Sequence, residues 1–201
     1  MELRETHCSK NDILDFWFGP LSGPKDFPVD HSSMWFVKDA KTDHKILQKF
    51  GFLFEKNLND WSIDSRGRLA RILVLDQFSR NIYRNTPQAF QFDPEALSLT
   101  VEGIQLEMDK ELFPVERGFF YMPLQHSEDL TIQDQSITAY SRLVEEAPEE
   151  VKEQCQGFLS FAEQHRAIIA RFGRYPHRNA ILGRLSTSEE LDFLKQPGSS
   201  F

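Results

Sequence analysis

Side chains that could do chemistry gather in three clusters, each beside apolar sequence. The first is Asp76-Gln-Phe-Ser-Arg-Asn-Ile-Tyr-Arg84, which ends a helix-like apolar run. On one helix Asp76 and Arg80 are four residues apart, as are Arg80 and Arg84, so one acid faces two arginines. Two interpretations are open. The pair could fix the helix register, or Arg84 could hold a carboxylate or phosphate bidentately.

The second cluster is Gln125-His-Ser-Glu-Asp129, which follows a proline suited to the first turn of a helix. On such a helix His126 and Glu128 lie about 200° apart, so a shared metal ion is disfavoured and no metal site is predicted. Acids in a first turn also have a structural explanation through the helix dipole. A structural or orienting role is favoured here over a general base.

The third cluster runs from His165 to Arg184 and contains histidines and arginines without one acidic residue, in a chain of formal net charge -8. Any single arginine is best explained by a salt bridge. The whole set instead favours an excess of cations in one cleft. Backbone N–H groups after Pro176 could add an anion nest.

The three clusters together define the candidate site. Proton transfer is assigned to His126, Glu128 and His177, and ligand binding to Asp76, Gln77, Arg80, Asn81, Arg84, Arg174, Arg178 and Asn179. The sequence has no Gly-rich phosphate loop, no Gly-x-Ser-x-Gly elbow and no His-Glu-x-x-His motif. The cofactor, the ligand, the oligomeric state and an enzymatic role therefore stay open.

Composition limits the class of protein. A chain of 201 residues that is 40% hydrophobic can form one domain, predicted to span 1–201. The acidic balance argues against binding nucleic acid or anionic membrane, which needs a basic face. Cys8 and Cys155 lie far apart, and no signal peptide or membrane-spanning run is visible. A soluble cytoplasmic protein is expected.

The elements that must position the site are helices, because every apolar run has helical spacing. The predicted helices cover 13–18, 43–57, 65–84, 94–109, 123–143, 148–172, 177–182 and 186–194. The aromatic groups at 34–36 and 119–122 are assigned to the core. Short connections predict antiparallel helical hairpins or an irregular bundle, and no repeat near 34 residues is visible.

The clusters in this order resemble a bacterial uncharacterised family called domain of unknown function 924. The motifs that carry the resemblance are Leu75–Arg84, Tyr121–Glu128, Arg171–Asn179, Ile13–Gly19 and Gln196–Phe201. This chain departs from the family pattern at Ser79 (proline), Gln125 (glutamate) and Tyr175 (phenylalanine). The resemblance implies an all-helical fold similar to the tetratricopeptide-like superfamily, and it implies no activity.

Two functions follow from these observations. In the first, Arg80, Arg84, Arg174 and Arg178 hold a small anionic ligand while His126 or His177 moves a proton. In the second, a helical scaffold binds a protein or peptide on a concave surface, and the polar clusters are internal struts. The arginines in the last third of the chain favour the first.

Overall fold

The computed structural model describes residues 8–199, and each regular element in that range is helical. The α-helices are α1 (Lys10–Phe18), α2 (Ser32–Phe36), α3 (Ala40–Phe50), α4 (Ser65–Ile72), α5 (Ser79–Ile82), α6 (Asp93–Gln105), α7 (Pro114–Phe120), α8 (Met122–Gln125), α9 (Leu130–Glu146), α10 (Lys152–Phe172) and α11 (Ser188–Phe193). Short 3-10 turns lie at Val29–His31, Gly51–Glu55, Asn59–Ile63, Pro87–Phe90, Met108–Glu111, Glu149–Val151 and Pro176–Arg178. The prediction of an all-helical fold is confirmed.

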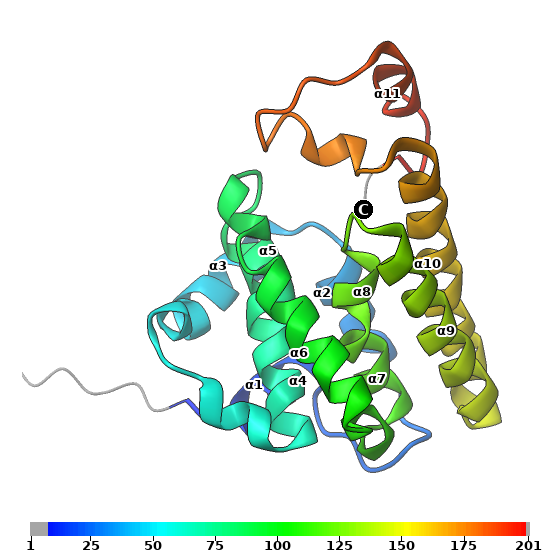
Figure 1. Ribbon diagram of the computed structural model, residues 1–201. Coiled ribbons are helices and arrows are strands. Elements are labelled where there is room, and N and C mark those ends of the chain that lie inside the picture. The colour runs from blue at the N-terminus through cyan, green and yellow to red at the C-terminus, as the bar shows by residue number, and fades with distance from the viewer. Residues whose placement is uncertain (1–7, 200–201) are drawn as a thin grey trace, which may run out of the picture.

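Long helices pair along one side of the molecule and shorter helices fill its centre. Figure 1 shows α9 and α10 side by side, with α4, α6 and α7 in the middle and α11 beyond the end of α10. None of the helices within 8–199 is long and apolar enough to cross a membrane. A tetratricopeptide-like superhelix is compatible with these hairpins and stays a prediction.

The central helix predicted over 65–84 changes its winding where the polar cluster begins. It starts at α4, whose N-cap is Asp64, and passes through a π-helical turn, Leu73–Phe78, into α5. The hydroxyl of Ser79 donates to the carbonyl oxygen of Leu75 at 2.5 Å. A π-turn widens the helix by one residue and is frequent at functional sites. Here it contains Asp76 and Gln77.

The helix predicted over 123–143 is wrong, because the chain breaks it at residues 126–129. The carboxylate of Asp129 accepts hydrogen bonds from the N–H groups of Thr131 and Ile132 and so begins α9 as a new helix. His126 and Glu128 therefore lie in a connection, and the helical angle between them does not apply. Sequence reasoning also missed α7, which begins at Pro114.

Two smaller predictions also differ from the structure. The helix expected from Asp43 begins earlier, at Ala40, with Asp39 as its N-cap, and gives way to a 3-10 turn after Phe50. The helix expected over 177–182 is only the 3-10 turn Pro176–Arg178.

Aromatic side chains form the main core. Trp17 and Phe119 are buried and their rings meet edge to face at 5.6 Å. Trp35 is also buried, whereas Phe36 is 53% exposed, so the assignment of residues 34–36 to the core holds only in part. A second, small cluster contains Ile168, Ile169, Phe172, Tyr175 and Phe193, and joins the end of α10 to the residues that follow it.

Candidate functional site

A buried carboxylate and a histidine form the centre of the site. Asp76 is fully buried in the π-turn, and its Oδ1 lies 2.7 Å from Nδ1 of His126, in the connection between α8 and α9. An ionised carboxylate only accepts, so the histidine carries its proton at Nδ1 and presents Nε2 as an acceptor. Within the described residues Nε2 has no hydrogen-bond partner, and the side chain is 14% exposed.

Arg80 connects this dyad to the start of α6. Its Nη1 lies 3.1 Å from Asp76 Oδ1, so the ion pair predicted from the four-residue spacing is present. Its two terminal nitrogens also bind the two oxygens of Asp93 at 2.9 and 3.0 Å. Gln77 donates to Asp76 Oδ2 at 2.5 Å. The buried carboxylate is therefore paired and hydrogen-bonded, as its burial requires.

Arg178 reaches the same place from the segment after α10. Its Nη1 donates to Asp93 Oδ2 at 3.2 Å and its Nη2 to the carbonyl oxygen of His126 at 3.0 Å. The Nε of Arg178 is buried and has no hydrogen-bond partner in the described part of the chain. The ring of Phe90 lies against both arginines, with its centroid 5.7 Å from Arg80 and 4.6 Å from Arg178.

The local charges keep Asp76 ionised and His126 neutral. Burial alone would raise the pKa of Asp76, but Arg80 and His126 outweigh it and hold the pKa below its ordinary value. Burial lowers the pKa of His126, and the Arg80 guanidinium lowers it further. A neutral imidazole whose Nδ1 is fixed by a carboxylate is suited to accept a proton at Nε2.

Arg84 and Asn81 bind a different acid, Asp43 of α3. The Nε and Nη2 of Arg84 lie 2.6 Å from the two carboxylate oxygens of Asp43, and Asn81 donates to Oδ1 at 2.8 Å. The sequence analysis took Asp43 as a helix cap and therefore did not predict that it pairs with Arg84. The guanidinium of Arg84 is thus engaged within the protein.

The remaining predicted residues make hydrogen bonds to or within the segment that follows α10. Glu128 accepts from the N–H of Tyr175 at 2.8 Å and from Arg184 at 2.6 Å. Arg174 binds both oxygens of Glu190. Asn179 donates to the hydroxyl of Ser186 at 3.0 Å.

His177 lies beside Tyr175, with 5.4 Å between the ring centroids. Burial lowers the pKa of His177 to about 4, so this histidine is neutral near pH 7.

The arginines of the third cluster do not form a group of unpaired cations. Within residues 8–199 they pair with acids from other segments: Arg166 with Asp134, Arg171 with Glu189, Arg174 with Glu190, Arg178 with Asp93 and Arg184 with Glu128. Acids distant in sequence thus balance a segment that looks purely basic.

Sequence reasoning missed two side chains of the site, and it assigned no role to a third, His165, which begins the third cluster. Asp93 was taken only as a helix cap, and Phe90 carried no signal. His165 lies on α10 with its ring centroid 6.1 Å from that of His126 and 5.7 Å from that of Tyr175. Its regular position on the buried face of a helix resembles that of any core residue.

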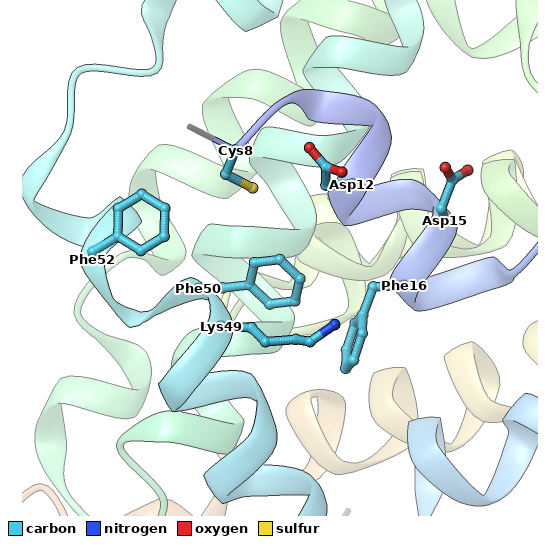
Figure 2. A pocket seen from close by; sticks show the side chains of 7 residues that line it. All are labelled: Cys8, Asp12, Asp15, Phe16, Lys49, Phe50 and Phe52. Atoms are coloured by element: carbon cyan, nitrogen blue, oxygen red, sulfur yellow. The ribbon is translucent and has the colours of Figure 1, made fainter. Parts of the chain in front are cut away.

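A cavity of about 440 Å³ lies elsewhere, between α1 and α3. Figure 2 shows the side chains that line it: Cys8, Asp12, Asp15, Phe16, Lys49, Phe50 and Phe52. The ammonium groups of Lys45 and Lys49 lie 5.2 and 5.5 Å from the ring centroid of Phe16. None of the residues predicted for the site lines this cavity.

The fold and the site together define an all-helical protein with a buried aspartate–histidine pair beside two arginines that share one aspartate. The chain belongs to the family described as bacterial protein of unknown function, DUF924, whose model matches residues 13–198. A solved structure of the protein of unknown function ATU0120 from Agrobacterium tumefaciens is similar, with 33% sequence identity and a TM-score of 0.76. The match covers 92% of this chain and 96% of that one. No curated protein matches the chain.

Proposed function

We propose that Asp76, Arg80, Asp93, His126 and Arg178, here called the His126 site, bind a small ligand with an anionic group and that His126 accepts a proton. One observation carries the proposal. The carboxylate of Asp76 fixes His126 through Nδ1 at 2.7 Å, while Nε2 has no partner in the described residues. A histidine held in this way can act as a general base.

The local backbone supports a functional role for this place. A π-turn is a rare departure from the α-helix, and here it carries the dyad carboxylate. Asp76 is fully buried, so keeping it ionised needs Arg80 and His126 beside it. A buried ion pair is weak evidence of stabilisation, because an apolar pair is often as stable.

The anionic group of the ligand is assigned to Arg178 and Arg80. Among residues 8–199 the Nε–H of Arg178 has no hydrogen-bond partner, and guanidinium groups bind carboxylates with defined geometry. Arg84 and Arg174, which were predicted to bind the same group, are each held by an internal acid. Arg80 and Arg178 are also paired with acids, and the proposal retains these two because they lie beside His126.

A thermal-shift screen with small carboxylates, phosphate and nucleotides tests the proposal. A ligand at about 100 times its dissociation constant adds about 2.7 kcal/mol, which raises the melting temperature of a chain of this size by about 5–10 °C. Arg178→Gln should abolish the shift. Arg166→Gln, which removes an arginine paired with Asp134 on the surface, should keep it. If no anion shifts the wild-type protein, or if both variants behave alike, the proposal is wrong.

A second candidate is a tetratricopeptide-like scaffold for a protein or peptide partner. The pairing of Arg84 with Asp43 and of Arg184 with Glu128 favours it, because such pairs can act as internal struts. Under this proposal a peptide library would select ligands whose affinity is the same for the wild type and for His126→Gln. Loss of that binding in the variant would favour the small-ligand site instead.

A further inference from the structure

The formal charges around the neutral His126 ring cancel. Asp76 and Asp93 are each negative, and Arg80 and Arg178 are each positive, so the four sum to zero. An anion that enters gains attraction from the arginines and repulsion of similar size from the carboxylates. Protonation of His126 would change the sum to one positive charge. The cluster therefore needs a proton before it can hold an anion firmly.

The geometry of the ring leads to the same requirement. Since Nδ1 of His126 already donates to Asp76 at 2.7 Å, the neutral ring presents only the lone pair of Nε2 to a ligand. A carboxylate oxygen also presents lone pairs, so it cannot hydrogen-bond to that nitrogen. Once Nε2 carries a proton it becomes a charged donor, and charge-assisted hydrogen bonds to a carboxylate are among the strong ones.

We infer that the His126 site takes up one proton with each small carboxylate it binds, so that the bound monoanion lies against a protonated His126. This inference rests on the proposed function and specifies its ligand class and its pH dependence. The proton is transferred from solvent to Nε2, and no covalent bond to the ligand forms or breaks. Asp76 then faces an imidazolium at 2.7 Å and stabilises it.

The other groups around His126 keep their charge state over the relevant pH range. Those nearest to it on neighbouring elements are Asp76, Arg80, Asp93, His165, Arg178 and His177. Carboxylates and guanidiniums remain charged between pH 6.5 and 8.5. Burial lowers the pKa of His165 to about 3 and that of His177 to about 4, so both rings stay neutral in this range. Proton uptake on binding is thus assigned to His126.

The experiment is calorimetric titration of the whole chain with formate, acetate and lactate between pH 6.5 and 8.5 at constant ionic strength. These ions do not titrate in this range, so any pH dependence of binding belongs to the protein. Repeating each titration in two buffers with different heats of ionisation measures the protons taken up. We expect about one proton for each ligand at pH 8 and an affinity that falls about tenfold for each pH unit.

Two histidine variants localise the proton. His126→Gln should bind more weakly and without pH dependence. His44→Gln, which changes an exposed histidine on α3, should behave as the wild type does. His126→Gln also removes a partner of Asp76 and could weaken binding for that reason alone. The NMR signals of the His126 ring in the wild-type protein therefore give an independent readout of its protonation. Adding acetate at pH 7.5 should move them to the imidazolium position.

The possible outcomes separate the two proposals. Binding of equal affinity at pH 6.5 and 8.5, without proton uptake, would overturn this inference and leave the proposed function standing. Proton uptake that persists in His126→Gln would also overturn it, because another group would then be the acceptor. If none of the three carboxylates binds at any pH while phosphate or a nucleotide does, the carboxylate class is wrong. If nothing binds, the proposed function fails.

Discussion

Two histidine rings lie against the buried ring of Tyr175, and a third histidine lies beside one of them. His165 lies 5.7 Å and His177 5.4 Å from the tyrosine ring, and His126 lies 6.1 Å from His165, measured between ring centroids. Burial lowers the pKa of each of these histidines. The folded state therefore binds fewer protons than the unfolded chain once the pH falls below the ordinary value near 6.5.

Stability should consequently fall on acidification, and His165 should account for part of the loss. The pKa of His165 is about 3 in the folded protein and near 6.5 in the unfolded chain. Its contribution to the free energy of unfolding is therefore present above about pH 6.5 and is lost as the pH falls from 6.5 toward 3. Between pH 7.5 and 5.0 the free energy of unfolding should drop by about 2 kcal/mol through this group. Urea denaturation at the two pH values measures the drop.

In His165→Gln the pH-dependent drop should be smaller by about that amount. His44→Gln is the matched control, since His44 is exposed and its removal should leave the drop unchanged. Equal drops in the wild type and in His165→Gln would show that His165 is not kept neutral by burial.

At the scale of the helices, one glycine allows α7 to pass close to α10. A Cβ atom added to Gly118 would lie 2.4 Å from the ring of Phe158. The hydroxyl of Tyr140 on α9 also donates to the carbonyl oxygen of Gly118 at 2.8 Å. By contrast, no atom of the described residues lies within 4 Å of a Cβ added to Gly157 on α10. A side chain at position 118 would therefore collide with a neighbouring helix, whereas one at position 157 would not.

Alanine at these two positions should have opposite effects. Gly118→Ala forces the Phe158 ring or α7 to move, and overpacking of this kind costs about 1–3 kcal/mol. Gly157→Ala adds helix propensity in open space and should stabilise the protein by about 0.5–1 kcal/mol. Thermal unfolding of both variants beside the wild type checks this. A stabilised Gly118→Ala would contradict the close approach of the helices.

Local interactions explain which elements the sequence could predict. Ser9 caps α1, Thr187 and Glu190 form a capping box on α11, and Gly173 ends α10, each through contacts within a few residues. The break between α8 and α9 was missed because Pro123 suits the first turn of a helix, and the polar residues 125–129 were taken as part of that same helix. Asp129 is a good cap in any sequence, but only the packed structure selects it over continuation of the helix.

The same distinction applies to the candidate site. The pair of Asp76 with Arg80 was predicted because four residues separate them on a helix. The contacts of His126 with Asp76 and of Arg178 with Asp93 join residues 50 and 85 positions apart. No spacing rule specifies such pairs, and charge alone allows many partners for each arginine.

At the scale of the whole molecule, the residues after α10 are attached differently from the rest. Their apolar contacts belong to the small cluster at the end of α10 rather than to the main core. Polar contacts hold them to the remainder, notably Arg178 with Asp93 and Arg184 with Glu128. Figure 1 shows this segment and α11 crossing one end of the molecule. Few buried apolar contacts favour local opening at a lower free energy than global unfolding.

Native-state hydrogen exchange should resolve that difference. Amides of 173–199 should exchange through an opening that costs less than the one exposing α4 and α7. Phe193→Ala, which removes a ring packed against Phe172 at 5.0 Å, should speed exchange in 173–199 and leave α4 unchanged. A uniform change throughout the chain would mean that this segment unfolds together with the core.

Because of the π-turn at Leu73–Phe78, the contact between Asp76 and His126 depends on the number of residues in the turn as well as on their identity. Each residue of a helix rotates the chain by about 100°, so deleting one residue from this turn would restore ordinary winding and swing the two flanking helices relative to each other. If the deleted residue precedes Asp76, Asp76 would turn away from His126 although every side chain of the site was still encoded. A homologue whose alignment has a gap in this turn before Asp76 would therefore lack the dyad, however well its polar motifs match.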